Sequence, residues 1–171
     1  ERGASLHAMD KSHLTALHLA AERGHTEVCR TLLRHGARVN AESMMDHWTP
    51  LHLAAKHGHQ DTVRLLIESG AEVDSACTLL DRWTPLYWAA EQGHTQVCEI
   101  LIQAGAMVNF EREDKAAPLH VAARRGRLPT CRLLLEHGAD LNHMSGYGWT
   151  PLHEAARKGH HDTISYLIRQ G

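Results

Sequence analysis

The sequence is poor in aromatic residues, in long hydrophobic runs and in charge of one sign. Aromatic residues make up 5% of the 171 residues, with a single Phe, so any core must be built from Leu, Ile, Val and Ala. A membrane span requires a run of about 18 apolar residues, and the sequence contains no such run. The formal net charge of −2 gives no bulk attraction to nucleic acid. Membrane insertion and nucleic-acid binding are therefore not expected.

Cysteine and the common catalytic motifs are also scarce. The four Cys contain no CxxC pair of the kind that zinc ribbons and redox sites use. Four reduced thiols are typical of the cytosol or the nucleus, and we expect the protein there. The motifs GxxxxGK[ST], GxSxG, GxGxxG and HExxH are absent. The sequence therefore predicts no enzyme and no cofactor in this segment.

A seven-residue motif recurs along the chain at a nearly constant spacing. It reads Thr-Pro-Leu-His-Leu-Ala-Ala in its second copy, and the copies lie at 15–21, 49–55, 84–90, 117–123 and 150–156. Successive copies begin 34, 35, 33 and 33 residues apart. Two further markers recur at the same spacing: a Gly that is usually followed by His, and a later Gly-Ala pair. Three markers in phase over five periods indicate a repeat protein.

The markers also predict the structure of each repeat. Thr before Pro is typical of a helix N-cap followed by the first helical residue, and the small residues after it predict a slim helix. The next Gly supplies the positive φ that ends this helix. A second amphipathic helix follows, as at 26–34, and a turn-rich connector such as 38–46 leads to the next repeat. The expected fold is an all-α solenoid of about five stacked repeats.

This pattern resembles that of ankyrin repeats over essentially the whole chain. The resemblance implies helix-turn-helix units joined by β-hairpin fingers, in one domain (1–171) with repeats at 10–43, 44–78, 79–111, 112–144 and, truncated, 145–171. Residues 1–9 read as the tail of a preceding repeat. Neither end shows the polar cap that solenoids usually need, so we expect a piece of a longer array.

The finger tips and their lengths depart from the family pattern. Where the family commonly has Gly at the tip, the first four fingers hold His13, His47, Arg82 and Lys115. A side chain at that place predicts a strained or reshaped turn. Extra residues near 43–45 and 76–80 lengthen two fingers, which costs little because loop-closure entropy grows slowly.

The repeat frame accounts for ten of the 16 histidines. By resemblance, those in the fourth motif place hydrogen-bond within and between repeats: His18, His52, His120 and His153. Others follow the turn Gly (His25, His59, His94, His160) or precede the Gly-Ala pair (His35, His137). The remaining six are scattered, so a metal site is not expected. Cys29, Cys98 and Cys131 occupy a place that is Val63 or Ile164 in other repeats, which indicates apolar core.

The resemblance places function in a concave groove lined by the fingers and the first helices, where such arrays bind partner proteins. Trp48, Trp83 and Trp149 stand just before the motif, and Trp88 stands within it. All four Trp thus fall on this surface, and large aromatics in a partly desolvated groove are common hot spots. Packing across the finger bases is the structural alternative for Trp48 and Trp149.

Basic residues collect after the last two motifs. They favour an acidic or phosphorylated peptide whose apolar side chains lie against Trp83 and Trp88; a merely solvated basic face is the alternative. The candidate contact residues are Trp48, Arg82, Trp83, Trp88, Glu91, Arg124, Arg125, Tyr147, Trp149, Arg157 and Lys158. The isolated segment is expected to be a monomer.

Two other functions remain open at this point. Residues 83–91 resemble a stretch of methyl-lysine-reading ankyrin domains of histone lysine methyltransferases, in which Trp83, Trp88 and Glu91 would form part of an aromatic cage. Val121 stands where that cage has its third Trp. The other possibility is a structural spacer within a larger protein. Separately, Asn142 resembles a target of asparaginyl hydroxylation, with Asn40 and Asn109 fitting less well.

Overall fold

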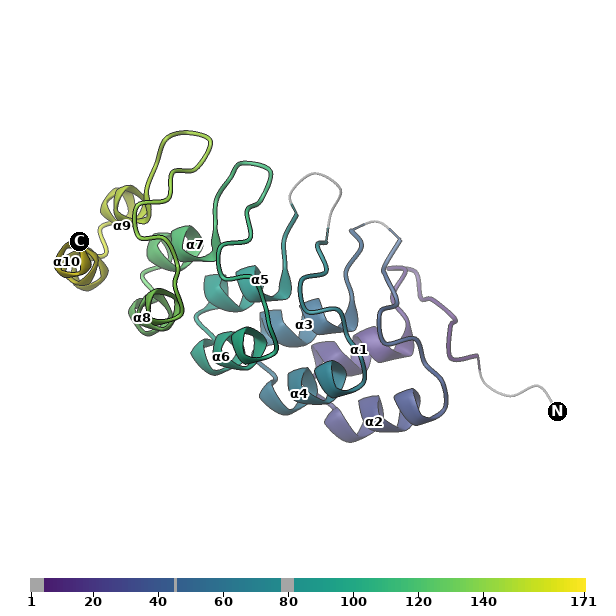
Figure 1. Ribbon diagram of the computed structural model, residues 1–171. Coiled ribbons are helices and arrows are strands. Elements are labelled where there is room, and N and C mark those ends of the chain that lie inside the picture. Colours follow the sequence, from purple (N-terminus) through teal and green to yellow (C-terminus); the bar gives the residue numbers. More distant parts are fainter. Residues whose placement is uncertain (1–4, 45, 78–81) are drawn as a thin grey trace.

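The computed structural model describes residues 5–44, 46–77 and 82–171. These residues form ten α-helices in five consecutive pairs, stacked in sequence order (Figure 1). The pairs are α1 (Ala16–Glu22) and α2 (Thr26–Arg34), α3 (Pro50–His57) and α4 (Gln60–Glu68), α5 (Pro85–Gln92) and α6 (Thr95–Gln103), α7 (Pro118–Arg124) and α8 (Leu128–Glu136), and α9 (Pro151–Lys158) and α10 (His161–Gln170). The all-α solenoid of about five repeats is confirmed.

The recurring motif begins each first helix in the expected way. In α3, the Thr49 hydroxyl accepts a hydrogen bond from the backbone N–H of His52, and Pro50 fills the first helical position, where no donor is needed. Gly58 ends the helix in the left-handed conformation, at φ +79°. The motif therefore sets both ends of a helix of two turns, short enough for close stacking.

The core lies between the helix layers. The motif leucines Leu17, Leu51, Leu86 and Leu119 are almost completely buried, as are the paired alanines at the end of the first four motif copies. Cys29, Cys98 and Cys131 are fully buried in the second helices, as predicted. Burial raises the pKa of Cys98 and of Cys131 to about 12, so both remain protonated thiols that pack as apolar groups.

Motif histidines of the first, second and fourth repeats each fix the following finger to their own repeat. The Nε2–H groups of His18, His52 and His120 donate to the backbone carbonyls of Trp48, Trp83 and Trp149, at 2.8, 3.0 and 3.0 Å. Nδ1 of each ring accepts the backbone N–H of the helix N-cap residue at 3.2 Å. This arrangement uses neutral imidazole, and burial lowers the pKa of all three, that of His52 to about 4.

A second set of contacts joins consecutive turns. His59 donates to the carbonyl of Glu22 at 2.8 Å, and a Cβ on Gly24 would lie only 2.5 Å from the His59 ring. His94 makes the same bond to the carbonyl of Lys56, between the second and third repeats. His160 makes it to the carbonyl of Arg124, between the fourth and fifth repeats. Between the third and fourth repeats the Nε–H of Arg127 takes this role. We call these four bonds the turn catches.

The fingers are less regular than β-hairpins. In the described residues the structure forms no strand there, only the isolated bridges Met9–Thr15 and Cys77–Trp83. As predicted, His13, His47, Arg82 and Lys115 have positive φ, between +50° and +58°, and Gly148 has +73°.

Part of the predicted finger geometry falls outside the described residues. This holds for the extra residues at 45 and 78–80, for the repeat boundary at 78/79 and for the first four residues of the predicted 1–9 tail. Within the described ranges, no helix combines the length and the apolar character that crossing a bilayer requires.

Candidate functional site

Three of the four tryptophans pack against one another. The ring of Trp88, from α5, lies 4.9 Å from that of Trp48 and 4.1 Å from that of Trp83, measured between centroids. Trp48 and Trp83 stand at the bases of consecutive fingers, and all three side chains are half-buried. This group, the tryptophan cluster, therefore ties two fingers to one helix.

The chain's own cations cover the exposed faces of the cluster. The Lys56 ammonium lies 4.7 Å from the ring centroid of Trp48 and 4.6 Å from that of Trp88. The Arg112 guanidinium lies 4.6 Å from the Trp83 ring and 5.1 Å from that of Tyr87. Cations over aromatic faces are attracted by the ring quadrupole. Each ring of the cluster therefore already has a cation of the chain itself within cation–π distance.

The third repeat holds its following finger by a different device. Tyr87 stands in the motif place of His, and its hydroxyl accepts a hydrogen bond from Arg112 at 2.9 Å. Arg112 also lies 3.7 Å from a carboxylate oxygen of Asp114. The finger between the third and fourth repeats is thus attached through side chains, in contrast to the imidazole-to-carbonyl bonds elsewhere.

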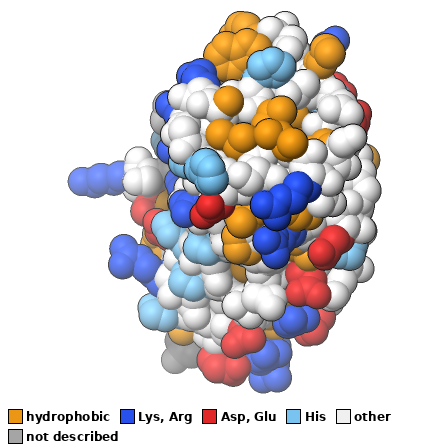
Figure 2. Space-filling view, turned by 90° about the vertical axis from the view of Figure 1, so that its left-hand side faces the viewer, with side chains coloured by type: hydrophobic (Ala, Val, Ile, Leu, Met, Phe, Trp, Pro, Cys, Tyr) orange, Lys and Arg blue, Asp and Glu red, His pale blue; other side chains and the backbone are white. Residues whose placement is uncertain are grey.

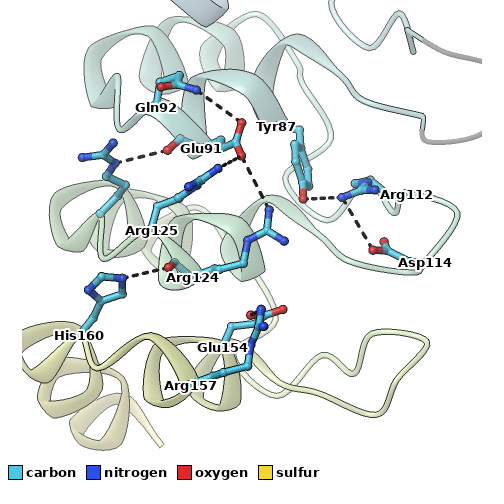
Figure 3. Close-up of polar contacts among 11 residues, drawn as sticks. Tyr87, Glu91, Gln92, Arg112, Asp114, Arg124, Arg125, Glu154, Arg157 and His160 are labelled. Carbon is cyan, nitrogen blue, oxygen red and sulfur yellow. Dashed lines mark hydrogen bonds and ion pairs between the residues drawn. The ribbon is translucent and has the colours of Figure 1, made fainter.

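Glu91 gathers the arginines that follow the fourth motif (Figure 3). Its carboxylate is only 5% exposed, and it lies 2.8 Å from Nη2 of Arg125 and 3.8 Å from Nη2 of Arg124. Its backbone carbonyl accepts the Arg127 turn catch at 3.3 Å. The predicted contact residues Glu91, Arg124 and Arg125 are therefore partners of one another, and the carboxylate faces neighbouring cations of its own chain.

The last finger keeps its aromatic residues accessible. Tyr147 is 79% exposed and Trp149 is 37% exposed, with ring centroids 6.4 Å apart. The Arg157 guanidinium lies 4.9 Å from the Trp149 ring and 3.1 Å from a carboxylate oxygen of Glu154. This pair, unlike the tryptophan cluster, presents large aromatic surface to solvent.

Two neighbouring hollows lie on the surface formed by the fingers and the first helices, here called the groove surface. The first, the aromatic pocket, has a volume of about 380 Å³ and is lined by Tyr87, Val121, Tyr147, Trp149, Glu154 and others. The second, the basic pocket, is more open, with about 820 Å³. Asp114, Arg124 and Arg157 line both. The two pockets are therefore adjacent.

The basic pocket carries a clear surplus of positive charge. Six cationic side chains line it, against the two carboxylates of Glu91 and Asp114: Arg112, Arg124, Arg125, Arg127, Arg157 and Lys158. Figure 2 views the molecule from the end formed by the last repeat, and Lys and Arg side chains gather along its left-hand edge, with hydrophobic side chains near the top. Charge and aromatic surface thus meet at this end of the array.

The structure divides the predicted contact residues into separate groups. Glu91, Arg124, Arg125, Tyr147, Trp149, Arg157 and Lys158 line the two pockets together with Trp83. Trp48 and Trp88 belong to the tryptophan cluster and line neither pocket. Arg82 lies on its finger over the ring of Phe110, at 4.7 Å, away from both. Tyr87 and Arg112 were missed, although Tyr in place of the motif His was a visible signal.

The three candidate hydroxylation sites differ in their surroundings. The side chains of Asn40 and Asn109 bridge to the next repeat, each donating to a glycine carbonyl and accepting a backbone N–H. Asn142 is exposed, and its backbone N–H is bonded to the Asp140 carboxylate. Hydroxylation stays a prediction for all three; Asn109 and Asn142 are exposed and Asn40 is half-buried.

A stack of helix pairs in sequence order defines the class of the protein, an all-helical repeat solenoid. Family models identify the repeats: Ankyrin repeats (3 copies) at residues 2–77, Ankyrin repeat at 81–112 and Ankyrin repeats (many copies) at 119–168. The chain therefore belongs to the ankyrin-repeat family. No curated protein matches it. Ankyrin repeats are generally protein–protein interaction modules, and the fold is typically non-catalytic.

Proposed function

We propose that this protein is an adaptor or scaffold module that binds an extended segment of a partner protein on the groove surface of its last two repeats. The observation that carries the proposal is that the aromatic and basic pockets lie side by side and share Asp114, Arg124 and Arg157 as lining residues. A single extended chain can contact both. Together they offer apolar area for affinity and charge for orientation.

The aromatic pocket is the proposed anchor site. Tyr147 and Trp149 are exposed, rigid and amphipathic, and such side chains dominate the binding energy of many interfaces. The Arg157 side chain stacked on Trp149 gives the pocket a charged rim. An apolar side chain of the ligand is expected to pack between these rings. This revises the earlier hypothesis that the apolar contacts fall on Trp83 and Trp88.

The chemistry of the basic pocket favours an acidic ligand. Its six cationic side chains exceed its two carboxylates, so an anionic segment lowers the electrostatic repulsion among the arginines. Guanidinium groups bind planar oxygen anions with paired hydrogen bonds. A cationic ligand such as methyl-lysine is disfavoured there. It is disfavoured at the tryptophan cluster as well, because Lys56 and Arg112 cover the rings and Glu91 faces arginine.

The buried thiols support a location in the cytoplasm or nucleus. All four cysteines are free and buried, and burial raises the pKa of each to about 11 or 12. Such thiols fit a reducing compartment.

A peptide library tests the proposal directly. Degenerate peptides that hold a fixed central Leu next to Glu are immobilised, and binding of the labelled protein is compared with binding of a Tyr147→Ala, Trp149→Ala double variant. We expect the double variant to bind at least about tenfold more weakly, since two hot-spot aromatics are lost. An Ile168→Ala variant on the exposed side of α10 serves as control and is expected to bind like the wild type.

The same experiment separates binding from a spacer role. A structural spacer predicts that no peptide of the library is retained, and that the double variant leaves every interaction of the protein intact. Retention that is equal for the double variant and the wild type would move the binding site away from the last two repeats.

A further inference from the structure

We propose that the group bound in the basic pocket is a phosphorylated side chain of the partner, adjacent to the apolar residue in the aromatic pocket. The proposal rests on the proposed function and names its ligand chemistry. The pocket has six cationic side chains and two carboxylates. One carboxylate of an acidic peptide carries a single charge, whereas a phosphate carries about −1.5 to −2 at pH 7 and three strong acceptor oxygens.

Glu91 prepares the arginines for such an anion. Its buried carboxylate lies 2.8 Å from Arg125 and 3.8 Å from Arg124, so it restrains both side chains before a ligand arrives. A guanidinium has five N–H donors, and the bond to Glu91 uses only part of them. Restraint in advance reduces the entropy lost on binding. The remaining donors are thus held ready for phosphate oxygens.

A second wall of the pocket is formed by α9. Arg157 and Lys158 are adjacent in sequence, both are exposed, and both line the basic pocket opposite the α7 arginines. In Figure 3, the Arg124 side chain extends from α7 between Glu91 and the Glu154–Arg157 pair. An oxygen anion placed there meets cations from two helices. Convergent cations of this kind suit a tetrahedral group better than a planar one.

The surplus charge is confined to one place, which favours a single phosphate over a nucleic-acid backbone. Glu91, Asp114 and Glu154 border the two pockets, and the chain as a whole has a net charge of −2. A nucleic acid needs a positive stripe that follows successive phosphates. Along this groove surface its neighbouring phosphates would meet carboxylates.

The two pockets also predict the order of the ligand. Because Arg124 and Arg157 line both, the anion and the apolar anchor must lie close together in the bound chain. The expected motif is a phosphorylated residue next to a large apolar residue, in an extended segment. A distant phosphate elsewhere on the partner does not meet this requirement.

Three matched libraries of short fluorescent peptides test the inference by anisotropy. They share a fixed Leu and differ only in the preceding residue, which is phosphoserine, Glu or Ser. We expect the phosphoserine library to bind at least about tenfold more tightly than the Ser library, with Glu in between. This preference is expected to shrink as salt rises, because screening weakens exposed charges.

The decisive variant is Arg157→Gln with Lys158→Gln, which leaves the Glu91 contacts intact. It is expected to lower the ratio of phosphoserine affinity to Ser affinity toward one. Because Arg157 also lies over the Trp149 ring, both libraries are expected to lose some affinity, so this ratio is the readout. Arg169→Glu, an exposed change on α10 outside both pockets, is the control for net charge. Circular dichroism verifies that both variants are folded.

Each outcome decides between the inference and the proposed function. Equal binding of the three libraries, reduced by Tyr147→Ala with Trp149→Ala, overturns the phosphate inference and leaves the proposed function standing. No binding of any library overturns both. Displacement of the phosphopeptides by polyuridylate at lower concentration than by phosphoserine peptide overturns the inference in favour of nucleic acid.

Discussion

The tryptophan cluster and the aromatic pocket are built on the same repeat position, yet only one of them is open. Trp48, Trp83 and Trp149 all precede a motif Thr. The first two are covered by Trp88 and by the cations Lys56 and Arg112, whereas Trp149 keeps 37% of its surface exposed beside Tyr147. The comparison teaches that the position of a residue within its repeat places it on the groove surface. Its neighbours in adjacent repeats decide whether the side chain packs against the protein or stays open to a ligand.

The sharpest way to break this comparison is to truncate one tryptophan on each side. Trp88→Ala removes the ring that joins Trp48 to Trp83 and is expected to lower the free energy of unfolding by about 3 kcal/mol, as large aromatic truncations in packed sites do. Trp149→Ala is expected to cost only about 1 kcal/mol, the scale of a surface cation–π contact. Urea denaturation followed by circular dichroism compares the two, and equal losses would contradict the distinction.

Acid is expected to destabilise the repeats that are anchored by histidine. Burial lowers the pKa of His18, His52 and His120 in the folded protein, that of His52 to about 4, while an unfolded His has a pKa of about 6.5. The unfolded state therefore takes up protons first, and stability falls as the pH drops below about 6.5 toward 4.

The melting temperature measured between pH 7.5 and pH 4 checks this expectation. His52→Gln is expected to be less stable at neutral pH and to lose less on acidification. His161→Gln, at an exposed histidine of α10, is the matched control and should follow the wild-type profile. A flat wild-type profile down to pH 4.5 would count against the buried neutral imidazoles.

Removal of the Glu91 charge separates its two roles. Glu91→Gln weakens the hold on Arg124 and Arg125, and we expect it to cost about 1–2 kcal/mol of stability, the scale of a charged hydrogen bond. The same change adds one positive charge to the basic pocket, so phosphopeptides should associate faster at low salt. Stopped-flow association rates at two salt concentrations measure this effect. A slower rate would show that restraint by Glu91 outweighs the added charge.

The smallest expected effect concerns the side-chain attachment of the third repeat. Tyr87→Phe removes the hydroxyl that accepts from Arg112 at 2.9 Å, and it is expected to cost about 1 kcal/mol. Tyr147→Phe changes an exposed ring and should leave stability unchanged. Thermal unfolding compares the loss of stability in the two variants. Equal stability of both would show that Arg112 is held by its ring contacts alone.

The fold was predictable because its signal is repeated. Motif, turn glycine and Gly-Ala pair recur in phase, and each has a local physical meaning, so the helix pairs follow from the sequence. The fully buried Cys98 and Cys131 were predictable for the same reason, since their position is apolar in every repeat.

The details of the site were not predictable from the position of each residue within its repeat. The contacts of Glu91 with Arg125, and of Lys56 with Trp48 and Trp88, depend on side-chain conformations and on the exact offset between neighbouring repeats. Repeat spacing leaves both undetermined. The basic residues of the last two repeats were found from the sequence, but their partner Glu91 was expected to face a ligand. Tyr87 was not recognised as an attachment point, because its bond to Arg112 also depends on side-chain conformation.

The turn catches have a mechanical consequence. Each one crosses a single junction, from the side chain of His59, His94, Arg127 or His160 to a carbonyl of the preceding repeat. No catch spans two junctions, and solenoid repeats contact only their neighbours. A pulling force along the stack acts on all junctions in series, and each junction can open without breaking the bonds of the others, so the array should lengthen in discrete steps of one repeat, beginning at the weakest junction.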